Sequence, residues 1–363
     1  MLNRNETITY RKDGRYMGRF IIDHKENGKP VYQYVYGKTY EEAEDKLRIA
    51  REIESRYISG RCIKLQAVYE EWMKGVSNRV KESTYANYRM KFEKHILPAF
   101  GETSCTEITS GKLNTFIKEK LDSGLSASYV RDMMTVFKTL LQYVQEEYHV
   151  HISLKNVVLP KVERKSSHKM SDEQQARLVA YIKEHLNLTA LGVLLSLFMG
   201  LRIGEVCGLQ WGDIDLEKKV LHINRTVQRI SMLNGDKKTK IIISEPKSNT
   251  SKRTIAIPDF LIPYLRQFQD SAEYYVLSGS CKVIEPRTMQ YRYKKILEQA
   301  EFPATNYHQL RHTFATNCME NGFDAKTISM ALGHSGVTLT LEWYVHPNIQ
   351  YERRMIQSLS ARF

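Results

Sequence analysis

The 363-residue sequence has few of the features that mark secreted, disulfide-linked or membrane proteins. Its five cysteines are scattered and odd in number, and no Cys-x-x-Cys pair occurs, so neither a disulfide framework nor a zinc site is indicated. The longest apolar stretch, Leu188 to Met199, is too short to span a bilayer. The N-terminus has no apolar run typical of a signal peptide. We therefore expect a soluble protein of the cytoplasm, with its thiols reduced.

The sequence also contains no P-loop and no cluster of carboxylates suited to two metal ions. Chemistry that depends on nucleotide hydrolysis or on paired metals is therefore not indicated. We predict neither a metal site nor a bound cofactor.

Acidic residues are fewer than basic ones. The chain has 54 Lys and Arg against 41 Asp and Glu, which gives a formal net charge of +13. The excess is largest in residues 161–363, which hold 28 basic and 20 acidic residues. Such a charge indicates an anionic polymer as the partner, and the length allows two or three domains.

Residues 6–36 are predicted to form three short strands. Asp13-Gly14 and Asn27-Gly28 are strong hairpin signals between β-rich runs. Alternation in the third run places its tyrosines on one face. Thr39, followed by Glu42, has a capping-box pattern that predicts a helix to about Tyr57.

The first hairpin is rich in basic side chains. A sheet of this kind can lie in a DNA groove, as β-ribbon readers do; the alternative is a solvated basic face of a small accessory domain. We predict DNA contacts for Arg11, Lys12, Arg15 and Arg19.

Residues 62–150 have helical periodicity. Ser83 or Thr84 is predicted to start a helix that ends near Leu97-Pro98, and a second helix is predicted over 109–121. The clearest helix covers 126–148, where an apolar stripe indicates a core. The stripe consists of Val130, Met133, Met134, Phe137, Leu140, Leu141 and Val144.

One face of this helical region combines tyrosines with basic residues. Such a face can contact phosphates, and a solvated charged surface is the alternative. The predicted contacts are Lys81, Tyr85 and Arg89, with Tyr88 and Lys91 on the same face. The polar segment that follows, 156–170, is predicted to be a linker between domains.

The C-terminal half opens with a predicted helix at Ser171, in a capping-box pattern with Gln174, and a buried helix over 188–198. Arg202 follows in Gly-Leu-Arg-Ile-Gly-Glu-Val-Cys-Gly, where the buried helix gives way to a turn. An arginine here can serve as a phosphate ligand. Pairing with Glu205 is the alternative explanation.

Three segments, 219–223, 240–244 and 253–257, are predicted to be strands. The last two flank a predicted hairpin that carries Lys247, in Pro-Lys-Ser, and Lys252. Lysines in such a turn usually serve solubility, which is the alternative to a functional role.

Between Tyr307 and Pro347, histidine, arginine and tyrosine occur in a suggestive order. His308 and Arg311 are three residues apart, so on a helix they share a face. His334 follows in Leu-Gly-His-Ser, and Tyr344 in Tyr-Val-His-Pro. Arginine matches phosphate oxygens, histidine moves protons near neutral pH, and an activated tyrosine hydroxyl is a nucleophile. Taken singly, each of these residues is more often an ordinary core or surface residue.

Together these segments resemble the tyrosine recombinase (phage integrase) family, because the arginine box, His-x-x-Arg-His, Leu-Gly-His-Ser and Tyr-x-His occur in the family's order. Tyr344 lies ten residues after His334, whereas many members have nine, and Tyr351 is the alternative nucleophile. Lys252 is the alternative to Lys247. The resemblance implies the catalytic set Arg202, Lys247, His308, Arg311, His334 and Tyr344.

In the chemistry that the resemblance implies, Tyr344 attacks a scissile phosphate, forms a 3′-phosphotyrosyl bond and leaves a free 5′-hydroxyl. The two arginines stabilise charge on the non-bridging oxygens, and His334 adds a donor. His308 accepts or shares the tyrosine proton, and Lys247 protonates the departing oxygen. Rejoining then needs neither ATP nor metal.

The resemblance implies a multidomain α+β protein. We expect a three-stranded sheet plus helix, then a helical core-binding bundle, then a mostly α catalytic domain with a small antiparallel sheet. The expected domains are an arm-type DNA-binding domain at 1–60, a core-binding domain at 61–155, a linker at 156–170 and a catalytic domain at 171–363.

The partners that the resemblance implies are double-stranded DNA at core and arm attachment sites and three further copies in a tetramer. An excisionase and a host DNA-bending protein are possible additional partners, and no membrane is expected. We predict an integrase of a phage or mobile element. The alternatives are a DNA-relaxing enzyme of the type IB topoisomerase kind and a non-catalytic DNA-binding regulator.

Overall fold

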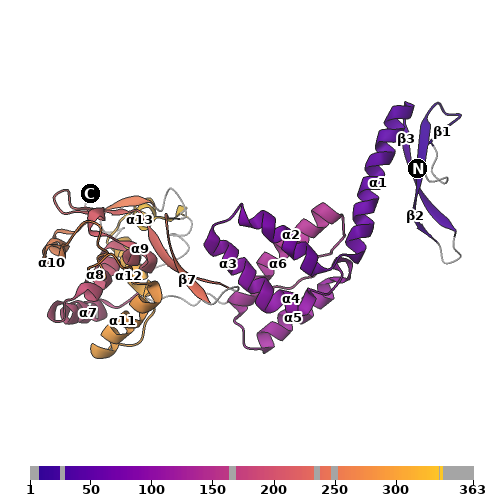
Figure 1. The fold of residues 1–363 in the computed structure, drawn as a ribbon. Helices are drawn as coiled ribbons and strands as arrows, with labels where there is room; N and C mark the ends of the chain where they lie inside the picture. Colours follow the sequence, from indigo (N-terminus) through magenta and orange to yellow (C-terminus); the bar gives the residue numbers. More distant parts are fainter. Residues whose placement is uncertain are drawn as a thin grey trace, which may run out of the picture. The chain divides into compact units, whose positions relative to one another are not determined.

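The computed structural model describes residues 8–24, 29–162, 169–232, 238–246, 252–334 and 336–337. The chain divides into two compact units, Met1–Glu163 and Arg164–Phe363 (Figure 1). Each unit buries a hydrophobic core of its own.

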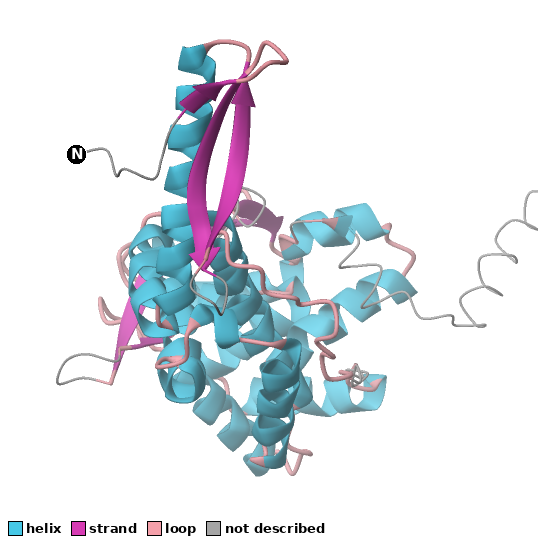
Figure 2. Ribbon diagram, turned by 90° about the vertical axis from the view of Figure 1, so that its right-hand side faces the viewer, coloured by secondary structure: helices cyan, strands magenta, loops and turns pink. Residues whose placement is uncertain are grey.

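The first unit begins with a three-stranded antiparallel sheet in the order β1-β2-β3. Helix α1 (Tyr40–Cys62) runs alongside β2 and β3 (Figure 2). Phe20 of the sheet and Ala43 and Leu47 of the helix are buried. The prediction of three strands and a helix is therefore confirmed, although the Asn27-Gly28 turn lies outside the described residues. The strands are β1 (Ile8–Tyr10), β2 (Tyr16–His24) and β3 (Pro30–Gly37).

The start of α1 has the predicted cap. The Thr39 hydroxyl accepts a hydrogen bond from the backbone N–H of Glu42 at 3.1 Å. The Glu42 carboxylate accepts one from the Lys38 N–H at 2.7 Å, one residue before the N-cap. These bonds satisfy donors that a helix start leaves unpaired. The helix continues beyond the predicted end near Tyr57, as far as Cys62.

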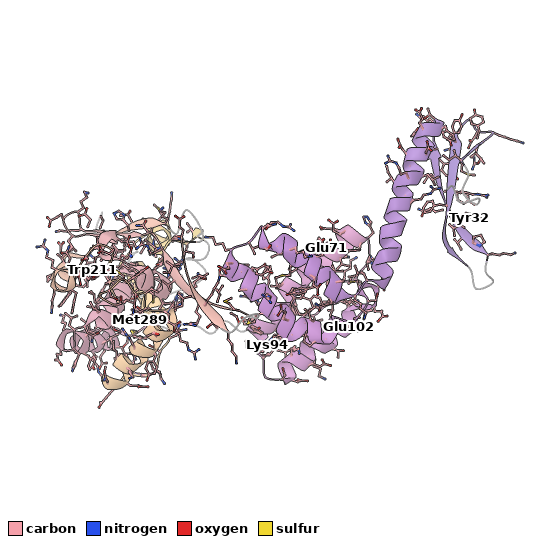
Figure 3. The ribbon with its side chains drawn as sticks, viewed as in Figure 1. Tyr32, Glu71, Lys94, Glu102, Trp211 and Met289 are labelled. Atoms are coloured by element: carbon pink, nitrogen blue, oxygen red, sulfur yellow. The ribbon has the colours of Figure 1, made fainter. Side chains whose placement is uncertain are left out.

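A bundle of helices completes the first unit. The predicted stripe of α6, the longest helix of this bundle, is fully buried, and it forms the centre of this core. Glu71 ties α2 to α6, because its carboxylate accepts hydrogen bonds from the hydroxyls of Tyr143 at 2.6 Å and Tyr148 at 2.5 Å (Figure 3). The helices are α2 (Leu65–Ser77), α3 (Glu82–Lys91), η1 (Phe92–Ile96), α4 (Leu97–Phe100), η2 (Cys105–Glu107), α5 (Ser110–Asp122) and α6 (Ala127–Tyr148).

The predicted helix end near Leu97-Pro98 is wrong by a few residues. After α3 the backbone passes through one π-helical turn, η1, and continues as α4 to Phe100. Pro98 lies in the first turn of α4, directly after the π-helical turn. A proline signal therefore marked the start of a helical segment here, not its end.

The second unit is mostly helical around a small amount of sheet. Trp211 and Met289 belong to its core (Figure 3). The helices are α7 (Asp172–Glu184), α8 (Leu188–Met199), α9 (Ile203–Gly208), η3 (Trp211–Asp213), η4 (Asp259–Leu261), α10 (Ile262–Phe268), α11 (Pro286–Gln299), α12 (His308–Glu320) and α13 (Ala325–Leu332). The strands are β4 (Ile214–Asp215), β5 (Val220–Ile223), β6 (Thr226–Ser231), β7 (Thr239–Ser244) and β8 (Arg253–Ala256).

The expected hairpin between β7 and β8 is not present. Strand β8 pairs with β5, so that Ile255 lies opposite Leu221 with both buried, whereas β7 pairs with β6. Strand β6 was not predicted. Strands β7 and β8 therefore belong to two different sheets, β6-β7 and β4-β5-β8. Local sequence indicates that a segment is extended, but the partner strand depends on side chains far away in sequence.

Helix α8 organises the second unit. All but three of its residues are buried, because the segment is apolar on every side. It packs on α12, and the buried Tyr307, just before α12, donates a hydrogen bond to the carbonyl of Gly192 at 3.1 Å. This packing brings the end of α8 close to α12 and α13, where the predicted catalytic residues lie.

Candidate active site

Arg202 lies between α8 and α9, as predicted. Helix α8 ends at Met199, and Gly200 has a left-handed backbone, with φ of 66°. The Arg202 guanidinium donates to Glu205 Oε1 at 2.8 Å and to the Gly333 carbonyl at 2.9 Å. The Arg202 side chain is 34% exposed, so part of this cation remains open to a ligand from solution.

Arg311 lies on α12 and is only 1% exposed. Its Nη1 donates to the Gly200 carbonyl and its Nη2 to the Leu332 carbonyl, both at 2.8 Å. The side chain thus joins the end of α8 to the end of α13. Charged hydrogen bonds of this kind hold a buried guanidinium in one orientation.

His334 follows directly on the C-terminal cap of α13. Gly333 has a left-handed backbone, with φ of 63°, and the N–H of His334 donates to the Ser329 carbonyl at 3.0 Å. This is the bond pattern of a Schellman motif, which favours glycine at the left-handed position. The Leu-Gly-His sequence therefore has a structural reason, because the glycine turns the chain and presents the histidine.

Glu205 is the buried counter-ion of the site, at 4% exposed. Burial opposes its ionisation, but hydrogen bonds and charge from Arg253, together with Arg202, outweigh burial and keep the pKa of the carboxyl below its ordinary value. The alternative explanation of Arg202, pairing with Glu205, is thus also correct as a description of its contacts. Arg202 pairs with Glu205 and still exposes part of its guanidinium to solvent.

The histidines of the site have lowered pKa values. Burial, together with the charges of Arg311, Arg202 and Arg253, lowers the pKa of His334 to about 4. Burial of its inner side and the neighbouring His312 and Arg311 also lower the pKa of His308, although His308 is exposed as a residue and water moderates the effect. Both imidazoles are therefore neutral at pH 7.

Four of the six predicted catalytic residues come together in this way. Arg202 and Arg311 bond neighbouring carbonyls of the segment that carries His334, and the charges of both arginines act on His308 and His334. Lys247 and Tyr344, and the alternative nucleophile Tyr351, lie outside the described residues. The alternative lysine, Lys252, is described and exposed.

Arg253, the first residue of β8, was missed by the sequence analysis. It is 7% exposed in its side chain and forms a two-pronged pair with Glu205, with both N···O distances at 3.0 Å. Its Nε also donates to the Ala331 carbonyl at 2.6 Å. The available signal was an arginine at the start of a predicted strand, but its partners are 48 and 78 residues away in sequence.

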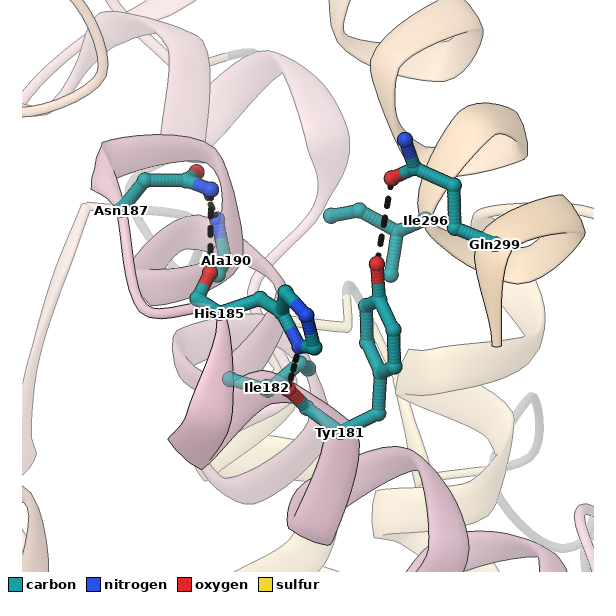
Figure 4. A pocket seen from close by; sticks show the side chains of 7 residues that line it. All are labelled: Tyr181, Ile182, His185, Asn187, Ala190, Ile296 and Gln299. Atoms are coloured by element: carbon teal, nitrogen blue, oxygen red, sulfur yellow. Dashed lines mark hydrogen bonds between the residues drawn. The ribbon is translucent and has the colours of Figure 1, made fainter.

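A hollow of about 450 Å³ lies at the N-terminal end of α8, opposite the end that leads to Arg202 (Figure 4). There the Tyr181 hydroxyl donates to Gln299 at 3.1 Å, and the ring of His185 stacks on Tyr181. Asn187, which caps α8, also lines it. Its lining residues include no arginine or lysine, and a 12-residue helix places it roughly 18 Å from the arginines. The hollow is therefore not suited to bind a phosphate group.

The basic residues of the N-terminal sheet lie close to its tyrosines. In the register of β2 and β3, Arg19 is opposite Tyr34, on the face away from the buried Phe20. The Arg19 guanidinium lies 4.9 Å from the ring centre of Tyr32. Tyr32, Tyr34 and Tyr36 thus share a face, as predicted.

The hairpin loop before β2 adds further charge to this sheet. The guanidiniums of Arg11 and Arg15 lie 5.5 and 5.4 Å from the ring centre of Tyr36. Both pair with Asp13, at 3.2 and 2.9 Å, which offsets part of their charge. Lys12 is exposed.

In the helical bundle, the predicted phosphate face is smaller than expected. Lys81 is exposed and lies four residues before Tyr85 and eight before Arg89, on one side of α3. Arg89 pairs with Glu93 at 2.7 Å. Lys91 does not belong to the face, because it is buried and paired with Asp132. Helical spacing alone did not reveal that Lys91 points inward.

Within the described ranges, no group of three or more His, Cys, Asp and Glu side chains is arranged to hold a metal ion. No helix in the part of the chain that the structure describes is both long and apolar enough to cross a membrane.

Comparison with known families gives two matches along the chain. The model of the phage integrase family matches residues 168–350, which is about half of the chain. The model described as the N-terminal SAM-like domain of phage integrases matches residues 64–121.

Similar curated proteins cover almost the whole length. A tyrosine recombinase XerC-like protein of Caldanaerobacter subterraneus subsp. tengcongensis is 28% identical over 395 residues, covering 98% of each chain. The ICEBs1 integrase of Bacillus subtilis is 26% identical, covering 86% of this chain and 87% of its own.

Solved structures show a shared fold. The Tn1549 transposon integrase in complex with transposon right end DNA matches with a TM-score of 0.65 and 18% identity, over 82% of this chain and all of that chain. A lambda integrase tetramer bound to a Holliday junction matches with a TM-score of 0.59 and 17% identity, over 93% of this chain and 97% of that chain.

Proposed function

The chain belongs to the phage integrase family of tyrosine recombinases, enzymes that cut and exchange DNA strands, and on that basis we propose that it is the integrase of a phage or of an integrative mobile element. It is a site-specific recombinase that joins DNA through a 3′-phosphotyrosyl intermediate. The observation that carries the proposal is the convergence of Arg202, Arg311 and His334 where α8, α12 and α13 meet.

The proposed first step is attack by the Tyr344 oxygen on the scissile phosphorus. A P–O bond forms to the tyrosine as the P–O5′ bond breaks. His308 is neutral at pH 7 and can take the phenolic proton, and Lys247 gives a proton to the departing 5′-oxygen. In the reverse step, the 5′-hydroxyl freed in the partner duplex attacks the phosphotyrosine, and the new phosphodiester forms as the bond to Tyr344 breaks.

The arginines and His334 stabilise the charge that develops on the phosphate. Arg202 is the partly exposed guanidinium, so it is the one that a non-bridging oxygen meets first. Arg311 is buried and keeps its orientation through two carbonyls. Donors that are fixed before the substrate arrives need no reorganisation during the reaction, which is why such sites are effective. His334, neutral in the protein alone, can donate one N–H to a phosphate oxygen.

The N-terminal sheet supports an integrase with arm sites. We propose that residues 1–60 bind arm DNA through the face that carries Tyr34 and Arg19, with Arg11, Lys12 and Arg15 at its edge. Its guanidiniums are held over tyrosine rings, so they are ordered but still near the surface. A narrow sheet with such a face fits a DNA groove.

The remaining assignments follow the same proposal. Residues 61–155 form the core-binding domain, with Lys81, Tyr85 and Arg89 toward phosphates, 156–170 the linker, and 171–363 the catalytic domain, with Lys252 beside the DNA. The protein acts as a tetramer on DNA in the bacterial cytoplasm. An excisionase and a host DNA-bending protein would set its direction.

Covalent trapping tests the chemistry. The protein is incubated without metal on a nicked duplex that carries the junction of its element, and the products are separated on a denaturing gel. We expect a protein–DNA band that Tyr344→Phe abolishes and that the matched change Tyr351→Phe leaves intact. The opposite pattern would make Tyr351 the nucleophile. Specific binding with no band from the wild type would favour a non-catalytic regulator.

A second experiment separates an integrase from a type IB topoisomerase. Two duplexes with attachment sites are mixed with the protein, and four-way junctions are sought on a native gel. We expect junctions that depend on both sites. Relaxation of supercoiled DNA without any junction would favour the topoisomerase.

A further inference from the structure

Three arginines bond three consecutive carbonyls at the end of α13. Arg253 donates to the carbonyl of Ala331, Arg311 to that of Leu332 and Arg202 to that of Gly333. The last four carbonyls of a helix have no partner within it and carry its negative end. This end of α13 is therefore held by three cations, each from a different part of the chain, directly before His334.

Two of these arginines also share one carboxylate. Glu205 Oε1 accepts from Arg202 at 2.8 Å and from Arg253 at 3.0 Å, while Oε2 accepts from Arg253 at 3.0 Å and from the Arg202 N–H at 2.9 Å. The Glu205 carboxylate is 4% exposed and the Arg253 side chain 7%. Of the two arginines, Arg253 has the fork–fork geometry, which fixes the plane of the carboxylate as well as its distance.

We infer that Arg253 is a positioning residue of the strand-exchange site, which orients Arg202 through Glu205 and His334 through the Ala331 carbonyl. The inference rests on the proposed function of that site. All three guanidinium nitrogens of Arg253 donate to Glu205 and to the Ala331 carbonyl, so its contribution to the site runs through these groups. Its action is indirect.

The position of Arg253 in the chain extends this coupling. It is the first residue of β8 and pairs in register with Ile223 of β5, so its backbone is fixed by the sheet. It also comes directly after Lys252 and six residues after Lys247. The Arg253 side chain therefore connects the backbone next to Lys252 with the end of α13, directly before His334.

Lysine cannot replace arginine in this arrangement. A lysine ammonium keeps the charge beside Glu205, but it has no planar fork and cannot bond both carboxylate oxygens and the Ala331 carbonyl in one fixed geometry. A purely electrostatic contribution would survive Arg253→Lys, whereas a positioning contribution would not. The cleavage rate of Arg253→Lys therefore distinguishes a positioning role from a purely electrostatic one.

The test measures cleavage and binding separately on the nicked duplex. For Arg253→Lys and Arg253→Met we expect the single-turnover rate of covalent complex formation to fall about 100-fold, the loss typical of a small misplacement of catalytic groups. The Kd for the duplex should change less than about threefold, because no phosphate contact is removed. Rates are taken at a temperature where each variant is folded by circular dichroism. If Arg253→Met does not fold, Arg253→Lys carries the test.

A control variant and a double-mutant cycle separate a loss of positioning from a general loss of stability. Arg225→Met removes another arginine–carboxylate pair of the same unit, at 2.8 Å to the buried Asp213, and should lower stability while leaving the cleavage rate near wild type. In a double-mutant cycle, Glu205→Gln combined with Arg253→Met should cost little more than either change alone, since one carboxylate transmits the effect.

The titration of His334 provides a readout that loss of stability does not alter. The charge of Arg253 helps to lower the pKa of His334, so Arg253→Met should raise the pKa of this imidazole, and its NMR titration in the folded variant should shift to higher pH. A wild-type rate in both Arg253 variants, with an unshifted His334 titration in Arg253→Met, would overturn the inference. The proposed function would fail in a different way, by the absence of a Tyr344-dependent band from the wild type.

Discussion

Arg311 is 1% exposed and donates to two main-chain carbonyls, whereas Arg15 has a side chain that is 55% exposed and rests over a tyrosine ring beside Asp13. The first arginine belongs to a cluster in which the cations have fixed positions and a buried counter-ion, Glu205. The second belongs to a sheet surface whose cations remain largely in water. A buried charge destabilises the folded state unless its hydrogen-bond partners are well placed, so a buried cluster is sensitive to small changes in geometry. A surface cation is tolerant of shape and sensitive to salt.

The largest effect is expected for the buried arginine, Arg311. Arg311→Ala should reduce covalent complex formation at least about 1,000-fold, since a fixed donor to the developing charge is lost. It should also lower the free energy of unfolding by about 3 kcal/mol, because the carbonyls of Gly200 and Leu332 lose their partner. Trapping gels and urea unfolding measure the two quantities.

Arg202→Ala is the matched control, because this guanidinium is 34% exposed. Its loss of rate should be similar, with a loss of stability of only about 1 kcal/mol. Equal losses of stability in the two variants would contradict the distinction between the buried and the open arginine.

The next effect concerns the backbone that supports Arg311. Gly200→Ala places a methyl group 2.5 Å from the ring of Phe314 at a position where φ is 66°. We expect a loss of about 3 kcal/mol from steric overlap and backbone strain. Gly322→Ala has a φ of 86° but no atom within 4 Å, so strain alone should cost about 1 kcal/mol. Thermal unfolding of both variants measures the difference.

Lowering the pH should weaken the cluster before it weakens the sheet. His334 has a pKa of about 4 in the protein and about 6.5 when unfolded. Above pH 6.5 neither state binds a proton there, so the full stability is present. As the pH falls from 6.5 to 4 the unfolded state binds the proton first, and about 3 kcal/mol of stability should be lost.

Urea unfolding of the wild type and His334→Gln at pH 7, 6, 5 and 4 tests this. The variant should show a flatter decline, while His185→Gln, an exposed histidine of the same unit, should follow the wild type. Parallel curves for wild type and His334→Gln would show that His334 is not the group responsible.

The smallest effect is expected on the sheet. Arg19→Ala should weaken binding to arm DNA about tenfold and reduce the salt dependence of log Kd by about one phosphate contact. The melting temperature should hardly change, because the side chain lies on the face away from the core. Arg48→Ala, on α1 and paired with Asp45 at 3.0 Å, is a matched loss of one exposed arginine that should leave arm binding unchanged.

The fold could be predicted from the sequence wherever one local signal dominates. The stripe of α6, the caps at Thr39 and Ser171, and the apolar α8 all match. The predictions were wrong where the outcome depends on a distant partner. Lys91 is buried beside Asp132, and β7 and β8, which the sequence predicted to flank a hairpin, belong to two different sheets.

The candidate site divides in the same way. The resemblance to the family predicted Arg202, His308, Arg311 and His334 as site residues, and the structure places them near one another, with Gly333 in the left-handed cap before His334. The roles of these residues, and those of Lys247 and Tyr344, remain proposals. Arg253 carries no local signal, because an arginine at the start of a strand is usually an exposed residue.

The sequence by itself determined the chemical groups, their order and the helices that carry most of them, because helical periodicity and capping act over a few residues. Only the tertiary structure decided that Glu205 is shared by two arginines and that three arginines meet at the end of α13. The physical reason is that a buried charge is stable only beside its partners, and those partners come from segments up to 131 residues apart.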